Sequence, residues 1–167
     1  MIITGKTLRA LNETDIKQCF FILLEHRSLG FHQMHMWSLS QFQSELKHGG
    51  GFGIFNNGKL QSFILFRNAA DWLEVTCLAT DPWLQRKGLM KFLISHLVKS
   101  VSAINQNALS IKLEVHEQNL AALKVYKRSG FNVDGVRKNY FATGQNAVLM
   151  TLELQNHKSL ESDIALV

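Results

Sequence analysis

The hydrophobic positions change their spacing along the chain, and the clearest change falls between Leu73 and Val101. From Leu73 to Ala79 an apolar side chain recurs at every second position, which predicts a strand. Pro82, the only proline, has no N–H for a strand ladder, so the strand should end near Asp81. From Leu89 to Val101 the apolar positions follow helical spacing with polar side chains opposite, which predicts an amphipathic helix.

The same criteria divide the rest of the chain. Asn57-Gly58 is the strongest short signal for a hairpin turn, because both central residues of such a turn need positive φ. Gly49 to Gly51 predict the end of a helix, and Gly130 suits a left-handed helix C-cap. The predicted strands are 7–11, 52–55, 60–66, 73–80, 110–116, 131–136 and 147–154, and the predicted helices are 16–24, 38–46, 89–101 and 120–129. This order predicts a mixed α/β sheet with helices on both faces.

A basic turn, Gln85-Arg86-Lys87-Gly88, lies where the central helix begins. Helix N-termini carry unpaired N–H groups and partial positive charge, and a glycine lets an anion approach them. The turn therefore predicts a phosphate or pyrophosphate site. Neither a Walker loop nor a G-x-G-x-x-G dinucleotide fingerprint is present. On this turn alone, an ordinary exposed basic turn remains an equal alternative.

The composition narrows the class of protein to which the chain belongs. The 167 residues are 46% hydrophobic and 19% charged, which suits one soluble globular domain. No apolar run long enough to span a membrane and no signal peptide pattern is seen, and Cys19 and Cys77 match no disulfide or metal spacing, so we expect a reduced cytoplasmic protein. The net charge of +5 favours acidic partners such as coenzyme A phosphates or RNA. His32 and His35 are weak evidence for a metal, and we expect none.

Two motifs carry a family resemblance. Q-R-K-G-L-M followed by L-E-V-H-E-Q-N-L-A-A-L-K-V-Y-K-R-S-G-F resembles the GNAT acetyltransferases, and more closely their ribosomal-protein alanine N-acetyltransferases. The resemblance covers roughly residues 37–154, including L-A-T-D-P before the turn and V-R-K-N-Y-F near the end. It implies one GNAT domain over 1–154 with a tail at 155–167. The implied fold is a central mixed, mostly antiparallel sheet in which parallel strands 73–80 and 110–116 splay apart to admit acetyl-CoA.

Two residues are candidates for catalysis. Glu114 is a carboxylate within an apolar strand and faces away from Leu113 and Val115; a salt bridge would explain it, and the resemblance implies a general base. A normal Glu has a pKa near 4.3, so it would act through water or with a raised pKa. Tyr126 shares a helix face with Asn119; packing would explain it, and the resemblance implies a general acid that protonates the departing thiolate.

The resemblance also implies which residues hold acetyl-CoA. The backbone of Leu78, Ala79 and Thr80 would pair with the pantetheine arm, and Asn119 would contact the cofactor as well as cap its helix. The pyrophosphate turn would consist of Arg86, Lys87, Gly88, Leu89, Met90 and Lys91. Met90 stands where the family pattern has Gly or Ala, which predicts a weaker grip on the cofactor. We expect His116 on the strand surface, and Trp37 with its preceding loop along the acceptor groove.

The sequence thus predicts an acetyl-CoA-dependent N-acetyltransferase acting on a protein N-terminal α-amine, in the most specific case the alanine of a ribosomal protein. A small-molecule amine, a lysine side chain or an aminoacyl-tRNA are alternative acceptors. A non-catalytic CoA-binding or RNA-binding module is a third interpretation. We expect a monomer or homodimer, with no membrane partner and with nucleic acid involved only through a ribosome.

Overall fold

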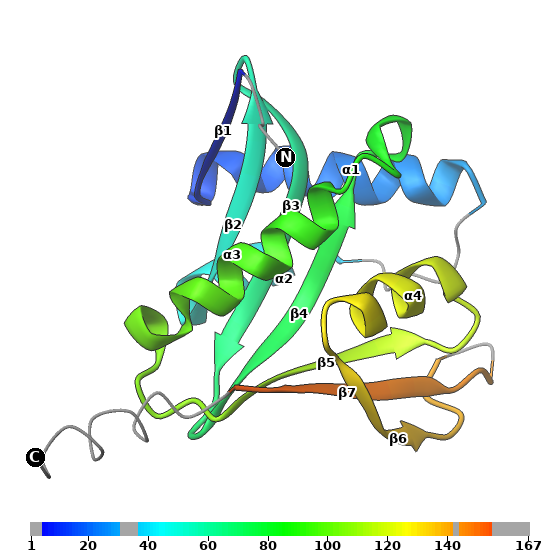
Figure 1. The fold of residues 1–167 in the computed structure, drawn as a ribbon. Helices are drawn as coiled ribbons and strands as arrows, with labels where there is room; N and C mark the ends of the chain where they lie inside the picture. Colours follow the sequence, from blue (N-terminus) through cyan, green and yellow to red (C-terminus); the bar gives the residue numbers. More distant parts are fainter. Residues whose placement is uncertain (1–4, 31–36, 142–143, 155–167) are drawn as a thin grey trace, which may run out of the picture.

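Strands β1 to β7 form one sheet, in the order β1-β2-β3-β4-β5-β7-β6, in the computed structural model, which describes residues 5–30, 37–141 and 144–154 (Figure 1). The strands are β1 (Lys6–Ala10), β2 (Gly49–Asn56), β3 (Lys59–Asn68), β4 (Trp72–Thr80), β5 (Ser110–His116), β6 (Asn132–Arg137) and β7 (Ala147–Glu153). The helices are α1 (Ile16–Ser28), α2 (Leu39–His48), α3 (Leu89–Ile104) and α4 (Leu120–Arg128), with short 3-10 turns η1 (Glu13–Asp15) and η2 (Pro82–Leu84). Neighbouring strands pair antiparallel except β4 with β5.

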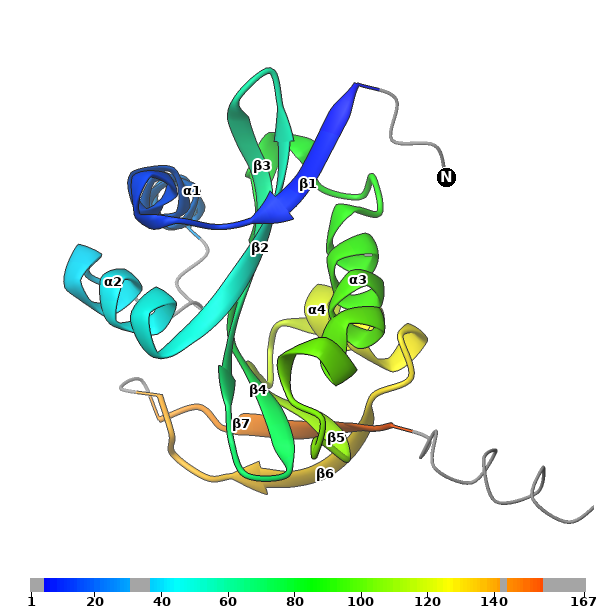
Figure 2. The same cartoon turned by 90° about the vertical axis from the view of Figure 1, so that its left-hand side faces the viewer.

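Helices cover both faces of the sheet. Figure 2 shows α1 and α2 on one side and α3 and α4 on the other. Alternation along β3 explains this, because Phe63 and Leu65 join the core under α1 and α2, whereas Ile64 and Phe66 join the core under α3 and α4. The predicted mixed sheet with helices on both faces is confirmed. No helix in the described ranges is long and apolar enough to cross a membrane.

The parallel strands β4 and β5 separate halfway along their length. They pair only from Trp72 to Val75 on β4 and from Ser110 to Leu113 on β5. The next residue of β4, Thr76, is the extra residue of a bulge in the pairing with β3. A bulge bends its strand and increases the local twist, which turns β4 away from β5 at this point. The two strands diverge beyond it, as Figure 1 shows, so the predicted splayed pair is confirmed.

The glycine run at 49–51 ends α2, as predicted, because α2 stops at His48 and Gly49 is its C-cap. The strand predicted to begin at residue 52 begins earlier, at Gly49, so the same glycines also open β2. A side chain does not fit there. A Cβ on Gly49 would lie 2.1 Å from the Phe66 carbonyl oxygen, and one on Gly51 would lie 2.7 Å from the Leu65 side chain. The glycines therefore allow a close approach of strands. The other turn predictions hold, with φ of 49° at Asn57, 76° at Gly58 and 95° at Gly130.

Candidate active site

A pocket of about 110 Å³ lies in the gap between β4 and β5. Its walls are residues 75–78 of β4, residues 113–116 of β5, Asn119 and Tyr126 at α4, and Trp37 and Phe141 from connecting segments. The gap exists because β4 leaves β5 at the Thr76 bulge, so the edge of β4 beyond this point has no strand beside it. The pocket is therefore a consequence of the sheet topology.

Glu114 and Tyr126, the two predicted catalytic residues, approach this pocket from opposite faces of the sheet. Leu113 and Val115 belong to the core under α3 and α4, and Tyr126 is buried in the same core. Glu114 alternates with Leu113 and Val115 and so faces the other side. Both line the pocket. The arrangement places a carboxylate and a phenol on either side of one gap.

Glu114 faces a positive charge. Its side chain is 24% exposed, and Oε1 lies 3.1 Å from a guanidinium nitrogen of Arg137. The Arg137 guanidinium carbon lies 4.9 Å from the ring centroid of Tyr140. Burial raises the pKa of Tyr140, and the negative charge of Glu114 raises it further. The salt bridge that the sequence left open is thus present, and its carboxylate, Glu114, forms part of the pocket wall.

The hydroxyl of Tyr126 has a raised pKa. Burial raises the pKa of its hydroxyl above the usual value, and the nearby Cys77 thiol raises it further. The Tyr126 ring packs against Phe131, with 5.8 Å between ring centroids. At neutral pH the group is a neutral phenol and is able to donate a proton or a hydrogen bond.

His116 was expected on the strand surface, and that expectation is wrong. It is only 5% exposed and lines the pocket. Its Nδ1 accepts a hydrogen bond from the Gln118 backbone N–H at 3.1 Å, and its ring centroid lies 4.5 Å from that of Phe141. The strand alternation that placed Glu114 on the pocket face also places His116 there, so the signal was present in the sequence.

Along β4, successive residues point their backbone N–H and C=O groups alternately toward β3 and toward the open edge. Asp81 N–H donates to the Gln61 carbonyl of β3, so Thr80 and then Leu78 turn their backbone groups away from β3. Ala79 faces β3, and its carbonyl also accepts from the Ser62 hydroxyl at 2.9 Å. The Thr80 carbonyl accepts from His26 Nε2 of α1 at 2.7 Å when that nitrogen carries the hydrogen. Of the three predicted residues, Leu78 is therefore the freest to pair with a ligand.

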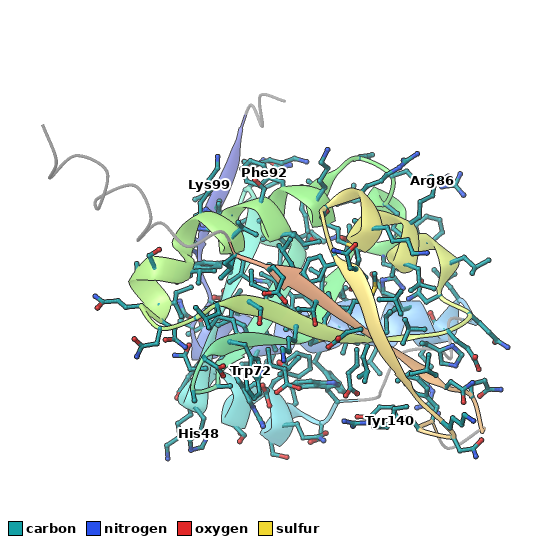
Figure 3. All side chains as sticks on the ribbon, turned by 60° about the horizontal axis from the view of Figure 1, so that its bottom comes forward. His48, Trp72, Arg86, Phe92, Lys99 and Tyr140 are labelled. Atoms are coloured by element: carbon teal, nitrogen blue, oxygen red, sulfur yellow. The ribbon has the colours of Figure 1, made fainter. Side chains whose placement is uncertain are left out.

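The basic turn has the geometry of an anion site. Arg86 and Gly88 both have positive φ, 60° and 79°, and a left-handed conformation costs a non-glycine residue about 1–2 kcal/mol. The first α3 bond of the turn runs from Phe92 N–H to the Gly88 carbonyl. Among the described residues, no partner accepts the N–H groups of residues 87–91. Arg86 stands beside the start of α3 in Figure 3, far from Tyr140.

Two further predicted cofactor residues have clear structural roles. Asn119 caps α4, because its Oδ1 accepts from the Ala122 N–H at 3.2 Å, and it also lines the pocket. Met90 is half-buried and packs against the core under α3. Its side chain thus folds onto the protein, while its backbone N–H remains part of the basic turn.

The remaining sequence candidates divide in two. Trp37 lines the pocket, and its place along an acceptor groove stays a prediction. His32 and His35, like the loop before Trp37 and the tail at 155–167, lie outside the described residues. Within the described ranges, no group of three His, Cys, Asp or Glu side chains is placed to hold a metal ion.

This fold and site define a class of enzyme. The chain belongs to the acetyltransferase (GNAT) family, whose model matches residues 15–131. As a member of that family it is an N-acetyltransferase that uses acetyl-CoA.

Particular relatives narrow the comparison. The chain is 30% identical over 152 residues to the [ribosomal protein bS18]-alanine N-acetyltransferase of Escherichia coli (strain K12), covering 89% of this chain and 97% of that protein. The crystal structure of the ribosomal-protein-S18-alanine N-acetyltransferase from Escherichia coli superposes with a TM-score of 0.77 at 27% identity, over 90% of this chain and 94% of that one. The yncA protein from Salmonella typhimurium, solved with its cofactor acetyl-CoA, shares the fold at a TM-score of 0.74 and 18% identity, over 92% of this chain and 96% of that one.

Proposed function

We propose that the protein transfers the acetyl group of acetyl-CoA to a protein N-terminal α-amine, with the N-terminal alanine of a ribosomal protein in the cytoplasm as its acceptor. Relatives that act on such an alanine match 89% of the chain. The observation that carries the proposal is the pocket between β4 and β5, to which Glu114 and Tyr126 contribute from opposite faces of the sheet.

Acetyl-CoA supplies a thioester carbonyl to this gap. We assign its pyrophosphate to the backbone N–H groups and positive charges of the turn from Arg86 to Lys91, and its pantetheine arm to the free edge of β4 at Leu78 and Thr80. Bulky substitution at Gly88, where φ is 79°, should remove this binding. Calorimetry on such a variant tests the assignment, and unchanged affinity would contradict it.

The acceptor then enters from the Glu114 face. Its neutral amine attacks the thioester carbon, a C–N bond forms, and the C–S bond breaks as the tetrahedral intermediate collapses. Glu114 takes the proton lost by the amine, through a water molecule. Tyr126 gives its proton to the departing sulfur. Glu114 then releases a proton to solvent and Tyr126 regains one from it, so protons balance over the cycle.

An α-amine suits this machinery better than a lysine. With a pKa of about 7.7–8.0, roughly a tenth of an α-amine is neutral at pH 7, whereas a lysine near 10.4 is neutral to less than about one part in a thousand. A carboxylate is a weak base, so an acceptor that is already partly neutral needs less from Glu114.

Two matched peptides test the acceptor. One carries a free N-terminal alanine, and the other has the same sequence with a blocked N-terminus and an internal lysine. With labelled acetyl-CoA, we expect transfer to the first and little to the second. Equal or faster transfer to the blocked peptide would refute the α-amine assignment, and transfer only to small amines or to aminoacyl-tRNA would favour those alternatives. Binding of acetyl-CoA with transfer to none of them would indicate a non-catalytic module.

A further inference from the structure

His116 is a buried polar residue in the pocket that the chemistry above does not use. The residue is only 5% exposed, and its imidazole ring packs against Phe141, with 4.5 Å between the ring centroids. Nδ1 of this ring has a hydrogen-bond partner among the described residues, and Nε2 has none among them.

The bonded nitrogen fixes the tautomer of the neutral ring. Nδ1 accepts from the Gln118 backbone N–H at 3.1 Å, so it cannot carry a hydrogen in that arrangement. The ring hydrogen is therefore on Nε2. No described residue accepts a hydrogen bond from Nε2, and His116 lines the same pocket as Glu114. The pocket wall thus carries a hydrogen-bond donor for which the described residues supply no acceptor.

The position of this donor matches the shape of one class of acceptor. Residues 114 and 116 lie on one face of β5, about 6.6 Å apart along the strand. Glu114 reaches the amine through a water molecule. In an α-amine the carbonyl carbon is only two bonds from the nitrogen, so its oxygen lies on the same side of the molecule, within about 4 Å of the amine. On this one face of β5, Glu114 is then near the amine and His116 is near the carbonyl oxygen of the same residue.

We propose that the Nε2–H of His116 donates a hydrogen bond to the carbonyl oxygen of the acceptor's first residue, so that the enzyme selects α-amino amides and peptides over amines without that carbonyl. This inference rests on the proposed function and adds to it the group that is recognised. In a lysine side chain the backbone carbonyl is six bonds from the reacting nitrogen, and a simple polyamine has none. The loss of this one bond therefore penalises both alternatives.

Alaninamide and isopropylamine form a matched pair that isolates the carbonyl. Both present an amine on a carbon that carries a methyl group, and only alaninamide has the carbonyl. We define the carbonyl preference as the ratio of kcat/KM for alaninamide to that for isopropylamine. The two amines differ in their neutral fractions, but that difference is the same for every enzyme variant and cancels when the preferences of variants are compared.

Two substitutions separate recognition from structure. In His116→Asn the side-chain oxygen replaces Nδ1 as the acceptor for Gln118, while the donor at the Nε2 position is lost. In His116→Gln the amide NH₂ reaches the Nε2 position, while the acceptor for Gln118 is lost. We expect the Asn variant to lower the carbonyl preference about 2- to 13-fold, the factor for one hydrogen bond of about 0.5–1.5 kcal/mol, and the Gln variant to retain most of it.

The opposite ranking would overturn the inference. If His116 only supports the loop at Gln118, the Asn variant should behave like the wild type, and the Gln variant should lose activity equally with both amines. Calorimetry with acetyl-CoA on each variant establishes that the cofactor site is intact. Failure of this inference leaves transfer to the alanine peptide unchanged, whereas failure of the proposed function appears in the wild type, as a preference for the blocked lysine peptide.

Discussion

The Tyr126→Phe substitution tests the assignment of the general acid most directly. It removes the hydroxyl and keeps the ring, so the packing against Phe131, at 5.8 Å between centroids, should survive. We expect kcat to fall while the dissociation constant of acetyl-CoA stays within about twofold of the wild type, because the hydroxyl acts in the transition state rather than in cofactor binding.

The size of the fall follows from the pKa values of the two groups. Burial and the Cys77 thiol hold the pKa of Tyr126 above 10.0, whereas a thiol has a pKa near 8.5. Proton transfer from phenol to thiolate is therefore uphill by at least about 1.5 pKa units, or about 2 kcal/mol. General acid catalysis typically contributes about 10²–10⁴-fold, and such an unfavourable transfer places Tyr126 at or below the lower end. We expect a loss of about 10- to 100-fold in kcat.

The assay follows release of the free CoA thiol at saturating acetyl-CoA and alanine peptide. A kcat unchanged by Tyr126→Phe would refute the role of the phenol, and a loss confined to acetyl-CoA affinity would make Tyr126 a binding residue. The pH profile gives a second check. Because the folded pKa is raised, the phenol stays protonated across pH 7–9, and the wild-type kcat should not fall there through loss of this proton. A falling limb in that range that disappears in the Phe variant would contradict the argument.

Three further substitutions give independent tests. Glu114→Gln should depress turnover most at low pH and least above the acceptor's own pKa, where neutral amine forms without a base; a pH-independent loss would speak against proton removal. Met90→Ala should reduce the free energy of unfolding in urea by about 1–2 kcal/mol because a half-buried side chain is lost, while tighter acetyl-CoA binding would show that the methionine obstructs the turn. Asp15→Asn should cost about 1.5–3 kcal/mol at pH 7, because hydrogen bonds of 2.7 and 2.8 Å from Arg9 lower the pKa of the buried Asp15 carboxylate. That stabilisation is present above the unfolded pKa of about 3.9 and is lost as pH falls through the lower folded pKa, so the two proteins should converge in acid; a constant difference would exclude the ion pair as its source.

Local pattern was sufficient to locate most of the fold. Period-two spacing located β4 and β5, because alternate side chains of a strand face the same core. Helical spacing located α3 and α4, because each helix buries one apolar stripe. The same reasoning located the end of α2 at Gly49 but missed that β2 begins there. A run of glycines has no side chain whose burial could be read, and the reason for it lies in the close approach of β3, on a distant part of the chain.

The sequence predicted those parts of the candidate site that depend on the alternation of side chains along one strand. It did not predict those that depend on the order of the strands in the sheet. Glu114 could be assigned to its face from its neighbours alone. Its partner Arg137 could not, because that contact needs β7 to insert between β5 and β6. His116, Ala147 and Arg137 lie in register across these three strands.

The gap between β4 and β5 is supported by specific contacts. At the bulge, the Thr76 hydroxyl donates to Glu45 of α2 at 2.9 Å, and this buried carboxylate also forms an ion pair with Arg67 of β3. A buried carboxylate is costly unless it is paired, so these contacts oppose any return of Thr76 to a regular ladder. Helix α2, which lies on the sheet face toward which Glu114 points, is thereby bonded to the residue at which the strands part. In the proposed mechanism the open edge of β4 receives the cofactor and the Glu114 face receives the amine, and the bonded bulge keeps β4 and β5 apart for both.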